Sequence, residues 1–215
     1  IMLDAIRSEL FDLLELKEYS WNPLLYMGEL GFAFESLTGF DFAPADARAA
    51  SLKGRLLQTP EYLRQAEAML ESCPKIHLKT GIRQCDGVIG MLTSGMDSFL
   101  EHVDSELSGE IRISSENALK SLNGFKAFLE SKLDDEHRDF RLGADLYEHK
   151  LSHTLREGIS SKDVLSRAEA TLKKTQDEMA VLAAPLYEEW FNEKPNTETH
   201  SGKLALIRRV LDEIG

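Results

Sequence analysis

The sequence has few of the residues that stabilise small secreted scaffolds, and it has no run that could cross a membrane. Its 215 residues contain two cysteines, Cys73 and Cys85, and no Cys-x-x-Cys pair or Cys/His cluster at zinc spacing. This excludes a disulfide framework, and we expect both thiols to be free. No apolar run approaches the roughly 20 residues that span a bilayer. We therefore predict no transmembrane segment.

Basic residues are also in short supply. The chain has 25 Lys and Arg against 37 Asp and Glu, which gives a net charge of −12. Such a chain repels phosphate backbones and anionic membrane surfaces, so nucleic acid is not an expected partner. The first residue is Ile, and acidic residues stand where a signal peptide would be basic. We expect a fragment of a longer protein, which leaves the compartment open between cytoplasm and periplasm.

Prolines and alternating β-type runs are scarce, whereas apolar residues recur at steps of three and four. The chain has six prolines and 42% hydrophobic residues, enough to bury a sizeable core. The pattern predicts an all-α fold of about eight to ten antiparallel and crossing helices, with no substantial sheet. We expect one helical domain over residues 1–215. Its first part, 1–44, should be an N-terminal helix followed by packed loops around a short helix.

Individual helices can be placed by their apolar faces and caps. Residues 2–18 predict a helix whose buried face carries Leu3, Ile6, Leu10, Leu13 and Leu14. A helix over 45–58 should end before a new one that Thr59 caps and Pro60 begins. A long helix from residue 75 to 103 contains four glycines, which favours a kink or close packing. The next helix should start at a cap on Ser114 or Ser115.

The clearest helix is predicted over residues 161–191. Ser160 and Asp163 have capping-box-like spacing. An apolar stripe follows in steps of four and three, and its members are Val164, Ala168, Leu172, Thr175, Met179, Leu182, Leu186 and Trp190. We expect this stripe to be buried against a partner helix. A last short helix is expected near residues 204–214.

The stretch FRLGADLYEHKLSH, residues 140–153, is the strongest candidate for a site, and Gly158 should end its helix. His149 and His153 are four residues apart, and Asp145 lies one turn earlier on the same face, which is ligand-like geometry. The zincin motif also needs Glu directly after the first His, but Lys150 stands there. Two interpretations remain open: a solvated helix face, or a metal site completed by a third ligand from another helix.

Other catalytic patterns are incomplete. Ser94 lacks the Gly-x-Ser-x-Gly elbow, and the glycines of GIRQCDGVIG have no preceding strand and no following Lys-Ser/Thr. The sequence therefore predicts no catalytic residue in this chain.

The order of several segments is familiar. RLLQTPEYLRQAEAML, GIRQCDGVIGML, FRLGADLYEHKL and MAVLAAPLYEEWF follow one another between Arg55 and Phe191. Together they resemble the N-terminal and middle helical region of a large bacterial family of uncharacterised proteins, the domain-of-unknown-function family 885. Its members look like zinc-dependent metallopeptidases of the gluzincin type. Their His-Glu pair and following Pro-Gly-His lie C-terminal to this region, and the present sequence contains neither.

The resemblance carries over Arg141, Gly143 and Tyr147. It implies that Arg141 pairs with an acidic residue or binds a substrate carboxylate, and that Gly143 lets the chain turn into the helix. A purely structural role is the alternative. We take Arg141, Tyr147 and His149 as candidate substrate-binding residues. No metal or cofactor is expected in this chain, because zinc would belong to the longer parent protein.

Two functional hypotheses follow. In the first, the chain is the helical scaffold and part of the substrate cleft of a zinc-dependent hydrolase, and its partner is the C-terminal catalytic region of the same protein. In the second, the chain is a self-contained helical binding module that uses the apolar region 21–44 and catalyses nothing.

Overall fold

The structure, a computed structural model, describes residues 2–155 and 159–215. Within these ranges the ordered elements are all helical and no strand occurs, which confirms the all-α prediction. The chain divides into two compact units, residues 1–146 and 147–215, each described here by itself. The expectation of one domain across the chain stays a prediction. The expected stop at Gly158 lies outside the described residues.

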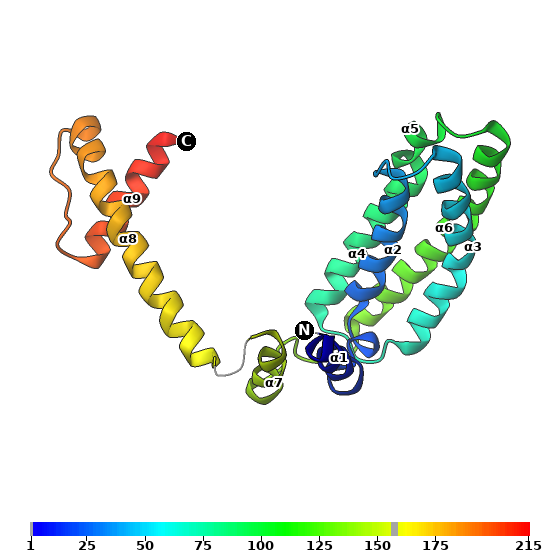
Figure 1. Cartoon of the computed structure of the whole chain (residues 1–215), viewed down its shortest axis with the longest axis horizontal. Coiled ribbons are helices and arrows are strands. Elements are labelled where there is room, and N and C mark those ends of the chain that lie inside the picture. Colours follow the sequence, from blue (N-terminus) through cyan, green and yellow to red (C-terminus); the bar gives the residue numbers. More distant parts are fainter. Residues whose placement is uncertain (1, 156–158) are drawn as a thin grey trace. The chain divides into compact units, whose positions relative to one another are not determined.

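Unit 1 is built around four long helices that lie side by side (Figure 1). Helix α3 contacts α2 and α6, and α4 contacts the same two helices from the other side. The bounds of the four are Pro23–Thr38 for α2, Ala45–Met69 for α3, Lys75–Gly90 for α4 and Ser105–Ser131 for α6. Their inward faces form one core, whose largest fully buried members include Phe34, Leu52, Leu56, Leu63, Leu78, Ile111, Leu122 and Phe125.

The N-terminal segment differs from its prediction. Helix α1 covers Met2–Phe11, and a π-helix, η1, replaces its continuation over Asp12–Leu16. The five residues predicted to be buried are exposed, whereas Phe11 and Leu16 are buried. A π-helix has wider turns than an α-helix, so it rotates the following residues out of the α-helical register. This change of register applies to Leu13 and Leu14, whereas Leu3, Ile6 and Leu10 precede the π-helix and lie on an exposed face of α1.

Helix α3 also corrects the prediction, because it runs unbroken through Pro60 instead of restarting there. Thr59 is not a cap: its hydroxyl donates to the Arg55 carbonyl at 2.9 Å inside the helix. Proline in a helix interior costs about 3 kcal/mol. Apolar side chains buried on both sides of Pro60 offset that cost. They are spaced by three and four residues and include Leu52, Leu56, Leu63 and Ala66.

The segment after Cys73 is shorter and more broken than expected. Helix α4 ends at Gly90 and is followed by a π-helix, η3, over Met91–Gly95 and by the short α5, Asp97–Leu100. Helix α6 begins earlier than predicted, because Asp104 accepts from the backbone N–H groups of its first turn. Ser114 and Ser115 are buried inside α6 and bond the carbonyls four residues before them, so neither is a cap.

Unit 2 consists of the end of α7 (Ala144–Thr154), the long α8 (Ser161–Phe191) and α9 (His200–Ile214). The predicted capping box at Ser160 and Asp163 is present. Helices α8 and α9 share a small core formed by Ala180, Ala183, Leu206, Ile207 and Val210. The predicted apolar stripe is mostly not part of this core. Leu172 and Leu182 are 59% and 72% exposed, because α9 packs against a neighbouring face of α8.

The composition predicted free cysteines and no transmembrane segment, and the structure bears on both. Cys73 and Cys85 are both free and buried, and burial raises the pKa of the Cys85 thiol to about 12. No helix in the described part of the chain is both long enough and apolar enough to cross a bilayer.

Candidate functional site

The three candidate substrate-binding residues lie in or just before α7. Arg141 and Tyr147 are exposed at the surface, and so is His149. The leucines between them, Leu142, Leu146 and Leu151, are half-buried. The segment thus has exposed polar residues and half-buried leucines. Arg141 belongs to unit 1, whereas Tyr147 and His149 belong to unit 2.

Arg141 forms a local pair with Asp139. The backbone N–H of Arg141 donates to the Asp139 carboxylate at 2.9 Å, and its guanidinium lies 3.4 Å from the same oxygen. The backbone bond is the main reason why the pKa of Asp139 lies below its usual range. The guanidinium also lies over the Phe140 ring, 4.6 Å from its centre. Gly143 follows with φ of +82°, a conformation that favours glycine, and α7 then begins.

The two histidines of α7 lie close to each other. Their rings are 5.0 Å apart at a tilt of 34°. Among residues 2–155 and 159–215, no group of three or more His, Cys, Asp or Glu side chains could hold a metal ion. A zinc site needs at least three protein ligands. We therefore derive no chemistry from a metal held by these described residues.

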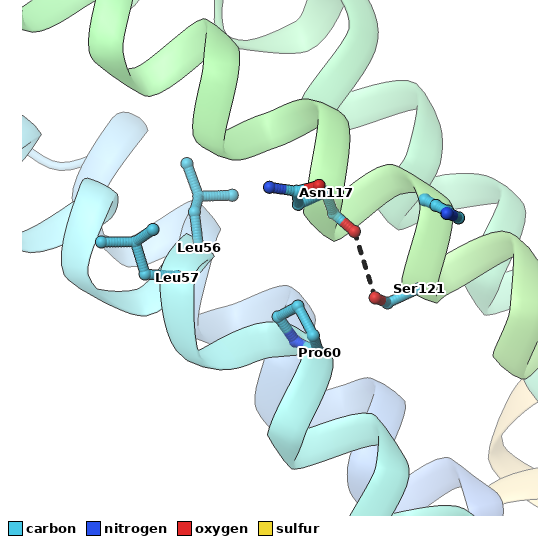
Figure 2. Close-up of a pocket in the computed structure, with 6 residues that line it drawn as sticks. Leu56, Leu57, Pro60, Asn117 and Ser121 are labelled. Atoms are coloured by element: carbon cyan, nitrogen blue, oxygen red, sulfur yellow. Dashed lines mark hydrogen bonds between the residues drawn. The ribbon is translucent and has the colours of Figure 1, made fainter.

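A pocket in unit 1 lies at the proline of α3 (Figure 2). It has a volume of about 520 Å³ and opens between α3 and α6. Pro60 has no N–H to bond the Leu56 carbonyl, and both residues line the pocket. Asn117 and Ser121 face them from α6, where the Ser121 hydroxyl donates to the Asn117 carbonyl at 3.1 Å. We did not predict this pocket. The uninterrupted apolar spacing through Pro60 was the signal that could have located it.

A second pocket in unit 1, of about 500 Å³, surrounds a buried arginine. Arg48 is 6% exposed, and its guanidinium donates to the Ala43 and Leu37 carbonyls at 2.9 Å each. It also bonds the Asp41 carboxylate at 2.6 Å and lies 4.9 Å from the centre of the Phe99 ring. These contacts fasten the loop between α2 and α3, so we assign Arg48 a structural role.

Unit 2 has a smaller pocket, of about 350 Å³, beside the loop that joins α8 to α9. Arg209 reaches from α9 to the Tyr187 hydroxyl at 2.7 Å and to the Glu193 carboxylate at 3.1 Å. Its guanidinium also lies 4.1 Å from the centre of the Phe191 ring. This cluster joins the end of α8 to α9. The charge of Arg209 is matched by Glu193, which favours a structural role here as well.

None of these arrangements, within the part of the chain that the structure describes, is a complete active site. What the chain resembles is more informative. The model of the family described as "Bacterial protein of unknown function (DUF885)" matches residues 1–211. This range is wider than the 55–191 segment suggested by the motifs, because it includes α1 and most of α9.

A solved structure has the same fold. It is a candidate lipoprotein of unknown function from Shewanella oneidensis, and it is 21% identical to the present chain with a TM-score of 0.74. The match covers 97% of this chain but 38% of that one, so the chain spans well under half of its solved relative. No curated protein matches the chain.

Proposed function

This chain belongs to the bacterial family DUF885, and we propose that it is the helical scaffold of a larger, zinc-dependent hydrolase of metallopeptidase type. In this proposal the catalytic metal is held by a further region of the same protein. The present chain supplies the bundle on which that region packs, and Arg141, Tyr147 and His149 form part of the substrate cleft.

The observation that carries the proposal is the difference in length between the chain and its solved relative. Nearly all of this chain matches a structure in which the matched part is only 38% of the polypeptide. A longer protein of this fold therefore has room for a metal-binding region that the 215 residues do not contain. The resemblance to gluzincin-type enzymes, in which His-Glu and Pro-Gly-His lie further along, supplies the kind of chemistry.

The cleft assignment is supported by the surface of the segment 140–153. Its polar candidates are exposed while its leucines are half-buried, so the polar groups lie at the surface where a substrate would bind. Arginine can hold a carboxylate through two parallel hydrogen bonds, which suits the terminal carboxylate of a peptide. The Asp139 carboxylate contacts one guanidinium nitrogen of Arg141, and the Arg141 side chain is 71% exposed.

The test is a hydrolysis assay on the longer gene product that contains this segment. Arg141→Ala and Tyr147→Phe should each lower kcat/KM for a peptide or ester substrate by about tenfold or more, the size expected for one lost binding interaction. Zinc content and melting temperature should stay unchanged. Lys150→Ala, in α7 but not a cleft candidate, is the control. Activity and melting temperature that fall together would instead make Arg141 and Tyr147 scaffold residues.

A second candidate function, a binding module without catalysis, is favoured by one observation. The region 21–44 exposes three aromatic side chains, Phe32, Phe40 and Phe42, at 65%, 55% and 65%. Exposed apolar groups of this size are typical of protein contacts. The gene itself discriminates between the two functions. A reading frame with His-Glu and Pro-Gly-His downstream of this segment supports the hydrolase, and a stop codon directly after Gly215 supports the module.

A further inference from the structure

The first half of α8 is exposed on every side within unit 2. Each residue from Lys162 to Thr175 is exposed, whereas the second half packs on α9 through Ala180 and Ala183. Isolated helices of this length are marginal in water, even when their sequence favours helix. The capping box at Ser160 supports the first turn only. A stable helix here therefore needs a surface to pack on.

The exposed half carries an apolar face suited to such packing. We call this face the α8 stripe, and it consists of Val164, Leu165, Ala168, Leu172 and, further along, Leu182. Leu165 and Leu172 are 58% and 59% exposed. The steps of three and four from Leu165 through Ala168 to Leu172 match the spacing with which one helix packs on another. Ala170 projects from the opposite side of α8.

We propose that the α8 stripe is the docking surface for a helix of the further polypeptide that a longer protein of this fold carries. This inference rests on the proposed function, because it requires the chain to be part of a longer protein. The match to the solved relative covers 97% of this chain and leaves most of that relative's polypeptide outside it. A protein of this fold thus carries further polypeptide outside the matched part, and we take that polypeptide as the occupant.

The small size of the stripe and the net charge of the chain favour this occupant over a second copy of the chain. A stable interface between separate proteins takes about 20 to 30 residues a side, and the stripe offers five apolar side chains. A segment of the same polypeptide has a high effective concentration, so a small surface is enough to hold it. The net charge of −12 further opposes the approach of two copies.

The test is amide hydrogen exchange over residues 162–175, measured in the 215-residue chain and in the longer gene product. Exchange in this segment should be at least about tenfold slower in the longer product, because docking protects the helix. Leu172→Gln should remove that protection. The matched control, Ala170→Gln, introduces the same neutral side chain on the opposite face and should leave it intact. In the 215-residue chain the two variants should exchange alike, and their circular dichroism should equal that of the unchanged chain.

Three results would overturn the inference. The first is equally fast exchange of residues 162–175 in both polypeptides, and the second is equal effects of Leu172→Gln and Ala170→Gln in the longer one. The third is a dimer of the 215-residue chain in light scattering that Leu172→Gln dissociates, because it would identify a second copy as the occupant. None of these readouts depends on zinc or hydrolysis, so failure of the docking proposal and failure of the hydrolase proposal are distinguishable.

Discussion

A β-carbon on Gly202 would stand 2.5 Å from the backbone oxygen of Asn196, so the loop before α9 fits against the start of that helix only when residue 202 is glycine. The Asn196 side chain also accepts from the backbone N–H groups of Glu198 and Thr199, and Thr199 in turn caps α9. The close approach therefore fixes the position at which α9 begins.

Gly202→Ala should destabilise unit 2 by about 1–3 kcal/mol, the usual cost of forcing an extra methyl group into a packed site. Urea denaturation followed by the fluorescence of Trp190, which lies in α8, measures this change. Gly124→Ala is the matched control. A β-carbon at Gly124 meets open space inside α6, so that variant should stabilise unit 1 slightly. A Gly202→Ala protein with unchanged unfolding would show that the loop can move aside.

Pro60→Ala should stabilise unit 1, because alanine restores the N–H that can bond the Leu56 carbonyl inside α3. We expect a gain of about 1–3 kcal/mol in the free energy of unfolding, since the helix cost of proline is partly offset by its effect on the unfolded chain. Gln58→Ala, at an exposed position two residues before Pro60, is the control and should change little. A loss of stability in Pro60→Ala would mean that the pocket between α3 and α6 depends on the proline ring.

The stability of unit 1 should depend on the protonation of His77. This side chain stacks on Trp21 with ring centres 5.8 Å apart, and its Nδ1 atom is buried with no hydrogen-bond partner in the described part of the chain. Burial lowers its pKa below the usual 6.5; the charge of Glu18 opposes this shift, and that of Arg138 adds to it. The unfolded chain thus binds the proton more tightly than the folded one.

This contribution of His77 is fully present above about pH 6.5 and is lost as the pH falls through the lower pKa of the folded state. The free energy of unfolding, measured between about pH 5 and 7.5, should therefore drop toward acid. His77→Phe should flatten the part of the drop that comes from this residue. A His77 resonance that titrates above 6.5 in the folded chain would contradict the prediction.

Leu172→Ala should change the stability of the 215-residue chain by no more than about 0.5 kcal/mol, because Leu172 is exposed. Leu206→Ala in α9 is the contrasting variant, since Leu206 is 2% exposed and its loss should cost about 2–5 kcal/mol. Chemical denaturation compares the two. A large effect of Leu172→Ala would show that the α8 stripe is already buried in the short chain.

Sequence periodicity predicted the helices well and their buried faces less well. The all-α class and the capping box at Ser160 follow from local rules of spacing and capping, which act within a few residues. The buried faces of α1 and α8 do not follow from local rules, because the face that is buried depends on which neighbouring element packs against the helix. In α8 the small residues Ala180 and Ala183 meet α9, and the more apolar stripe beside them stays exposed.

The breaks between helices were misplaced for a related reason. Thr59 and Pro60 carry a start signal, yet burial of Leu56 and Leu63 on either side keeps α3 continuous. Ser114 and Ser115 carry a cap signal, yet both are buried inside α6. Tertiary packing overrides local preference at such sites. Candidate site residues such as Arg141 could be named from the resemblance, but their pairing partners, such as Asp139, appeared only in the structure.

The measurement that tests the central claim most directly is zinc content together with peptide hydrolysis, determined for the 215-residue chain and for the longer gene product. The account predicts no stoichiometric zinc and no hydrolysis in the short chain, and about one zinc per chain with hydrolysis in the long one, as expected for a catalytic zinc site. A short chain that holds one zinc and loses it in His149→Ala/His153→Ala would contradict the account. So would a longer product that binds no zinc and hydrolyses nothing.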